Sequence, residues 1–225
     1  MNETPDVHTS IDTDHVPDPQ EAILTYYKQA KRTQMDLTTA SRGAYLTWGV
    51  AWLIGFGILW IGGRGGNGEA PMWALSVFYA CIIAAVVICT IFGVRAGQGT
   101  RSASSWSGVI YGVAWCCSFP VGLFMVAWFC KTYGIGMAAA GLMYTSLSVF
   151  LVGTLYIAGA AIWRDHSLLV IGIWMMVLTV WGVLVGVPQA YLVMALAGGG
   201  GMVLAFAQET WLIHRRTIRA AKAVG

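Results

Sequence analysis

No Asp, Glu, Lys, Arg or His lies at the middle of any long apolar segment in this sequence, so the charged groups of acid–base and metal chemistry are missing there. The histidines are His8, His15, His166 and His214, and only the last two fall near the same predicted membrane surface. Two histidines without a carboxylate cluster make a poor metal site, because zinc takes three or four protein ligands. A haem would need paired histidines inside the spans, and no nucleophile has a base at its own depth. We therefore expect no enzyme activity, no metal site and no cofactor.

Long apolar segments dominate the composition. The chain of 225 residues is 57% hydrophobic and 10% charged, whereas a soluble domain carries about 25% charged residues. A helix of roughly 20 apolar residues crosses the hydrocarbon layer of a bilayer. Six segments meet this requirement, namely 44–61, 72–94, 106–130, 137–163, 168–187 and 191–211. The predicted fold class is therefore all-α, a polytopic membrane protein with six transmembrane helices in a domain spanning residues 42–213.

Positive charges predict the orientation of these spans, because short loops rich in Lys and Arg stay in the cytoplasm. With the N-terminus in the cytoplasm, only Arg64 and Lys131 of the 13 Lys and Arg residues face outward. An even number of spans also returns the basic tail, residues 214–225, to the cytoplasm. These basic residues sit at membrane edges rather than on one folded face, so we expect no nucleic acid partner.

The chain before the first span divides into two parts. Residues 1–17 form an acidic tail that we expect to be disordered. Asp18, Pro19 and Glu21 then have the types and spacing of a helix start. We expect residues 18–41 to form an amphipathic helix and a link to the first span. Such a helix suits an anionic membrane surface; packing on a partner protein or on the chain's own loops is the alternative.

Two spans are interrupted near their midpoints. Span 106–130 contains Ser118 and Pro120, and the last span contains a run of four glycines. Proline and glycine weaken a helix, and interrupted spans at matching places in two halves are typical of a transporter's midplane site. Close helix packing at small residues is the alternative explanation. The candidate path residues are Trp115, Ser118, Pro120, Thr145, Gly198, Gly199, Gly200 and Gly201.

Glu209 is the one acidic residue predicted inside the end of a span, about one turn from the inner surface. We expect it to form an ion pair with a cytoplasmic-edge arginine, which would hold the ends of two spans together. The candidates are Arg164, Arg215 and Arg216. The alternative is a gate, or a site that attracts cations, at the inner mouth of a path.

One short motif carries a resemblance to known proteins. Trp48-Gly-Val-Ala-Trp52 opens the first span after the capped polar helix, and it has an echo in Tyr111-Gly-Val-Ala-Trp115. In this order of features the chain resembles poorly characterised small six-span bacterial inner-membrane proteins, which are often labelled candidate transporters. The resemblance implies a multi-pass protein of the bacterial cytoplasmic membrane, and no binding residue travels with the motif.

Two functions follow from these observations. The first is a transporter or permease-like subunit for a neutral, apolar or amphiphilic small molecule. The second is a membrane anchor, assembly factor or sensor that does not transport and binds a cytoplasmic protein through residues 19–32. A polar-lined cavity at the level of Ser118 and Gly199 would favour transport, and a filled bundle with an exposed terminal helix would favour partner binding. The bilayer is the partner in both cases, and a second copy of the chain is a further candidate.

The orientation can be tested by labelling single cysteines on intact cells, in a background without the five native cysteines. An impermeant thiol reagent should label Asn67→Cys in the first loop and should leave Ala220→Cys in the basic tail unlabelled until the cells are opened. Labelling of the tail from outside would contradict the orientation.

Overall fold

Helices make up the computed structural model, which describes residues 19–97 and 104–224. Six of its helical segments are long and apolar enough to cross a membrane, and no strand occurs in these described ranges. This confirms the predicted all-α fold with six spans. The acidic tail, residues 1–17, lies outside the described residues.

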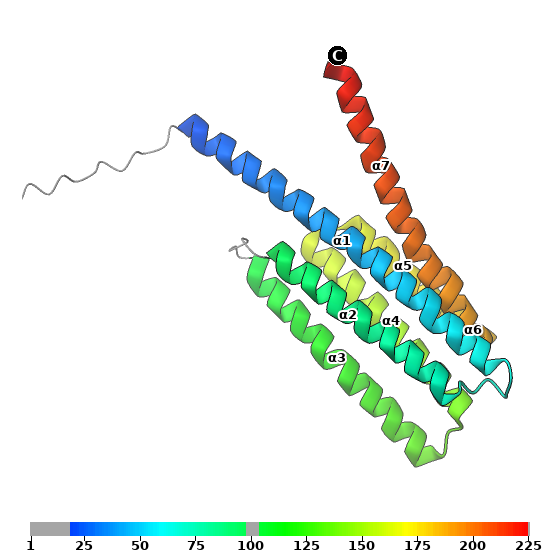
Figure 1. Ribbon diagram of the computed structural model, residues 1–225. Helices are drawn as coiled ribbons and strands as arrows, with labels where there is room; N and C mark the ends of the chain where they lie inside the picture. Colours follow the sequence, from blue (N-terminus) through cyan, green and yellow to red (C-terminus); the bar gives the residue numbers. More distant parts are fainter. Residues whose placement is uncertain (1–18, 98–103, 225) are drawn as a thin grey trace, which may run out of the picture.

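The helices follow one another with short connections (Figure 1). They are α1 (Pro19–Gly63), α2 (Met72–Gly97), α3 (Ser104–Tyr133), α4 (Met137–Trp163), α5 (His166–Val185), α6 (Gln189–Val193), η1 (Met194–Gly199) and α7 (Gly200–Val224). The last three run on into each other as one rod, in which η1 is a stretch of π-helix. Together they supply the sixth span, Gln189–Trp211.

The helix α1 is longer than the first span requires. It runs unbroken for 45 residues, so the segment expected to link the amphipathic helix to the membrane is itself helical. Residues 33–41 contain neither proline nor glycine, so nothing in this segment interrupts the helix. The N-terminal part therefore continues the axis of the first span, and Figure 1 shows it projecting beyond the other helices.

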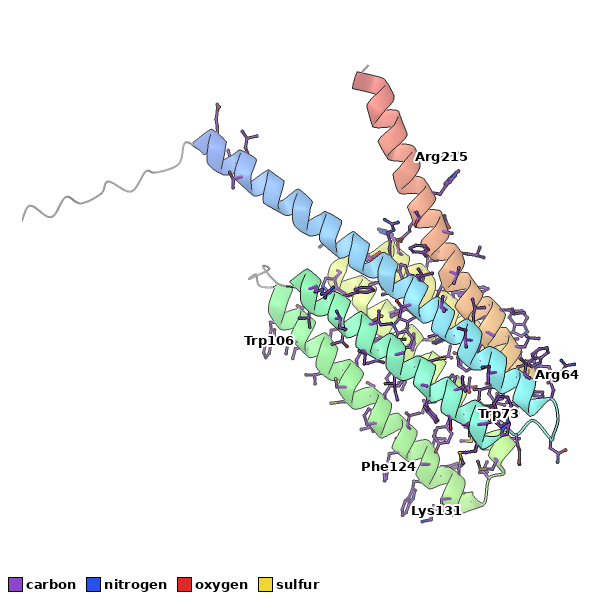
Figure 2. The ribbon with its side chains drawn as sticks, in the orientation of Figure 1. Arg64, Trp73, Trp106, Phe124, Lys131 and Arg215 are labelled. Carbon is purple, nitrogen blue, oxygen red and sulfur yellow. The ribbon has the colours of Figure 1, made fainter. Side chains whose placement is uncertain are left out.

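The bundle has two distinct ends. The projecting parts of α1 and α7 lie at the same end, which we call the termini end (Figure 1). The loop after α1 and the turn after α3 lie at the other end, which we call the loop end. Figure 2 places Arg64, Trp73 and Lys131 toward the loop end, and Arg215 on the part of α7 that projects from the termini end.

The helices pack in an order that differs from their order in the chain. α2 packs on α1, and α1 packs on the rod of α6, η1 and α7; this rod contacts α5, α5 packs on α4, and α4 contacts α3. The core forms where α1, α4, α5 and the rod meet, around Trp52, Val149, Met175, Leu178 and Met194. α3 is peripheral: it packs against α4, and side chains such as Val113, Phe124 and Trp128 are exposed.

The closest approach between α1 and the rod occurs at two glycines, Gly49 and Gly199. A Cβ atom added to Gly199 would lie 2.6 Å from the backbone nitrogen of Leu53 and 2.8 Å from the carbonyl oxygen of Gly49. A Cβ atom on Gly49 would lie 2.8 Å from Cγ2 of Val203. We call this contact the glycine crossing. Gly199 therefore cannot be replaced without moving the α1 backbone, whereas a Cβ on Gly49 first meets the side chain of Val203 and would need only a small adjustment if that side chain were changed. Small residues are what lets two helices approach this closely.

Replacing Gly199 with alanine should destabilise the protein by about 1–3 kcal/mol, because the new methyl group overlaps the α1 backbone. Gly200→Ala is the matched control, since an added Cβ meets nothing within 4 Å, and it should be neutral or stabilising by up to about 1 kcal/mol. Unfolding of the purified protein in mixed micelles with increasing SDS measures both. Equal stabilities for the two variants would refute the glycine crossing.

Candidate functional site

A small polar cluster joins α1 and α7 at the termini end of the bundle. Its members are Arg42 and Tyr45 on α1, and Glu209 and Thr210 on α7; we call it the termini-end cluster. The guanidinium of Arg42 donates a hydrogen bond to Oγ1 of Thr210 at 2.7 Å. The same guanidinium lies 5.7 Å from the ring centroid of Phe206, one turn earlier on α7. Arg42 therefore reaches from α1 to α7 on the termini-end side of the glycine crossing.

Glu209 lies beside this arginine, half-buried in the same gap. The positive charge of Arg42 and the negative charge of Asp165 both act on it electrostatically. Nε of Arg42 and Oε2 of Glu209 are shielded from solvent, and neither has a hydrogen-bond partner among the described residues. Opposite charges at one level of two neighbouring helices attract more strongly here than in water, because the surroundings are of low polarity. The cluster therefore ties α1 to α7 and still has unused polar atoms.

The predicted ion pair of Glu209 with Arg164, Arg215 or Arg216 stays a prediction, and the described side chains of the first two have other surroundings. Arg164 is exposed and ends α4 with a φ of 53°. The guanidinium of Arg215 lies 3.6 Å from the ring centroid of Trp211. The side chain of Arg216 lies outside the described residues, so its pairing with Glu209 stays a prediction. Sequence reasoning overlooked Arg42, although it is the last charge before the first span, as Glu209 is the last acid of the sixth.

The predicted path residues fall into two groups on different sides of the core. Gly198 and Gly199 lie in η1 against α1, where a Cβ on Gly198 would lie 2.8 Å from Cε3 of Trp52. Gly200 faces open space, and a Cβ on Gly201 would lie 3.3 Å from Nε1 of Trp174. The first two glycines thus serve helix packing, the alternative that the sequence left open.

The second group belongs to the α3–α4 pair. The ring of Trp115 stacks on that of Phe119 with centroids 5.6 Å apart. Ser118 is half-buried and Pro120 exposed on peripheral α3, while Thr145 is buried on α4. α3 continues through Pro120 without ending. The structure therefore puts these four residues on a different helix pair from the four glycines.

Aromatic side chains hold α3 against α4. Tyr111 donates a hydrogen bond from its hydroxyl group to the carbonyl oxygen of Leu155 at 3.0 Å, and its ring meets that of Trp163 edge-on at 4.7 Å. Trp115 contacts Tyr156 at 5.9 Å. The two copies of the repeated motif thus differ in role, because Gly49 lies in the glycine crossing whereas a Cβ on Gly112 would meet nothing within 4 Å.

Two of the shallow hollows on the surface of the described helices can be compared with the predicted path. One, of about 240 Å³, lies between α5 and α7 and includes Trp174, Gly201 and Gln208. The other is a patch on α5 alone, from Met176 to Leu184. Neither hollow is lined by Ser118, Thr145 or Gly199, so neither provides the polar-lined midplane cavity that would favour transport. Within the described residues, no group of three His, Cys, Asp or Glu side chains could hold a metal ion.

No protein-family model, curated protein or solved structure matches the chain.

The tie between Arg42 and Glu209 can be measured with a double-mutant cycle of Arg42→Gln and Glu209→Gln. Each single change should destabilise the protein, and the double variant should lose less than the sum, with a coupling of about 0.5–3 kcal/mol. Arg215→Gln combined with Glu209→Gln is the matched control and should be additive. A coupling with Arg215 as large as that with Arg42 would show that Glu209 is held by a different arginine.

Proposed function

We propose that this chain is a membrane-embedded binding protein, an anchor, assembly factor or sensor, whose projecting helices receive a cytoplasmic partner. The observation that carries the proposal is the glycine crossing. A midplane path would be lined by Gly198 and Gly199. The space beside these two glycines is occupied by Trp52 and by the backbone of α1. A path through this segment would require the two helices to separate and to lose their closest contact.

The same crossing supports a role for the projecting parts of α1 and α7. The two helices meet at the glycine crossing, are tied again by Arg42 and Thr210, and then diverge as two arms (Figure 1). The arm of α1, residues 19–41, extends about 35 Å at 1.5 Å per residue. Because α1 has no break between this arm and the first span, a force on the arm acts directly on the membrane-embedded part.

The arm of α1 also carries apolar surface that is exposed in the described part of the chain. Ile23 and Leu24 are 55% and 59% exposed. A solvated helix gains most of its stability by packing an apolar face, and exposed apolar surface rimmed by polar residues is typical of protein interaction sites. A cytoplasmic protein that packs on residues 19–32 would supply that contact. The positive charges of the loops and tail support placing this partner in the cytoplasm, and the bacterial setting rests on the resemblance noted from the sequence.

A second candidate function, transport with a gate at the termini end, is favoured by the unpaired atoms of Arg42 and Glu209. Half-buried charges at the mouth of a bundle attract ions or polar substrates, and such residues in membrane proteins are often functional. In this case the substrate would enter beside Arg42 and Glu209 and would have to bypass the glycine crossing, where α1 contacts η1 and α7.

Crosslinking distinguishes the two functions. A photoreactive amino acid at Leu24 on the arm of α1 should give one dominant protein adduct in native membranes, while the matched control at Leu184 on α5 should give lipid adducts alone. The contact itself is tested with the photoreactive amino acid at Thr25. With this label, the double variant Ile23→Ser and Leu24→Ser should give much less protein adduct than the chain in which Ile23 and Leu24 are unchanged. Absence of a protein adduct, together with flux in vesicles that Glu209→Gln abolishes, would contradict partner binding and support the gate.

A further inference from the structure

The hollow between α5 and α7 is a groove that is lined by side chains of both helices and open on one side. Val170, Trp174 and Met175 of α5 face Gly201, Ala205 and Gln208 of α7 across a groove of about 240 Å³. Nε1 of Trp174 donates a hydrogen bond to the carbonyl oxygen of Ala197 in η1 at 3.0 Å, which holds the indole ring in the wall of the groove. Gly201 has no side chain beside this ring, so the groove stays open there.

The groove lies in the termini-end half of the bundle and runs along α5 and α7. On α5 it extends inward from Val170, one turn inside the helix start at His166, to Met175. On α7 it extends from Gly201 outward to Gln208, one turn before the span ends at Trp211. Seven residues of helix correspond to about 10 Å. The groove therefore fits a linear apolar chain that enters from the surface at the termini end.

The lining of the groove is apolar except at its termini end, where Gln208 lies. Apolar side chains gain nothing from leaving lipid for protein, so a groove in a bilayer is filled for van der Waals contact and not by the hydrophobic effect. Acyl chains are the abundant filler at this depth. The carboxamide of Gln208 can donate hydrogen bonds to the ester or phosphate oxygens of the lipid that owns the chain.

Basic residues follow on both α5 and α7 beyond the termini end of the groove. Arg215 is seven residues after Gln208 and so lies on the same face of α7, two turns farther out; it is exposed and projects from α7 (Figure 2). On α5, His166 is one turn before Val170, and exposed Arg164 precedes it. The acidic neighbour Asp165 is engaged as the cap of α5, accepting a hydrogen bond from the backbone nitrogen of Ser167 at 2.7 Å. The mouth of the groove is therefore suited to a negative headgroup.

We propose that the α5–α7 groove binds an anionic phospholipid of the leaflet at the termini end, with one acyl chain against Trp174 and Gly201 and the headgroup between Gln208 and Arg215. This binding is independent of the arm of α1 and holds whether or not a protein partner docks there.

The test uses the full-length chain in nanodiscs of phosphatidylcholine with a minor fraction of phosphatidylglycerol that carries a photoreactive group on its acyl chain. Peptides containing residues 170–175 and 201–208 should be the most strongly labelled. Ala205→Phe fills the groove and should remove most of this labelling. Ala84→Phe, on an exposed position of α2, is the matched control and should leave it unchanged. Arg215→Gln should reduce the preference for phosphatidylglycerol over an equally labelled phosphatidylcholine roughly fivefold.

Three results would overturn the proposal. Labelling of α2 and α3 as strong as that of the groove would mean that the groove holds only ordinary boundary lipid. Unchanged labelling of a folded Ala205→Phe variant would place the lipid elsewhere. Equal labelling by phosphatidylcholine, unaffected by Arg215→Gln, would remove the headgroup site, and this last comparison stands even if Ala205→Phe fails to fold.

Discussion

The approach of α1 to the last span at Gly49 and Gly199 is the contact on which the rest of the arrangement depends. Transmembrane helices associate by van der Waals packing and hydrogen bonds, because the lipid is as apolar as their side chains. A pair of helices that meets backbone to backbone is therefore held more firmly than one that meets through long side chains. Here the crossing places Trp52 over Gly198 and brings Met194 of η1 into the core. The chain's first and last spans thus form the centre of the bundle, and the remaining helices pack outward from them.

The crossing also sets the register of α1 against α7 toward the termini end. Gly49 faces Val203 and Leu53 faces Gly199, so the two helices run antiparallel with Arg42 opposite Thr210. This register puts Glu209, the one acidic residue of the last span, within reach of Arg42, the cation that begins the first span. It also makes the arms of α1 and α7 extensions of packed helices and not loose tails. Because α3 contacts the bundle through α4 and its aromatic seam, the residues on it can vary without disturbing the crossing.

The spans were predictable from the sequence because length and hydropathy alone decide them, and each predicted boundary lies within a few residues of an apolar span in the structure. The partners of each helix were not predictable, because apolar faces carry no charge pattern that selects a neighbour. The four glycines show the limit: their spacing fitted both a substrate site and a packing contact, and only the position of α1 separates Gly199 from Gly200. Arg42 was counted as a topology signal, whereas its role beside Glu209 depends on a contact between residues far apart in the chain.

Disulfide formation across the glycine crossing tests the account most directly. In a background without native cysteines, Gly49→Cys and Val203→Cys should form a disulfide rapidly in membranes under mild oxidation. A Cβ on Gly49 lies 2.8 Å from Cγ2 of Val203. That methyl carbon is one bond from the Cβ of Val203, so the two Cβ atoms can reach the separation of about 3.5–4.5 Å that a disulfide requires. Gly57→Cys, where a Cβ meets nothing within 4 Å, should not crosslink with Val203→Cys. Failure of the first pair to crosslink, or equal crosslinking of both pairs, would contradict the packing of the first span on the last.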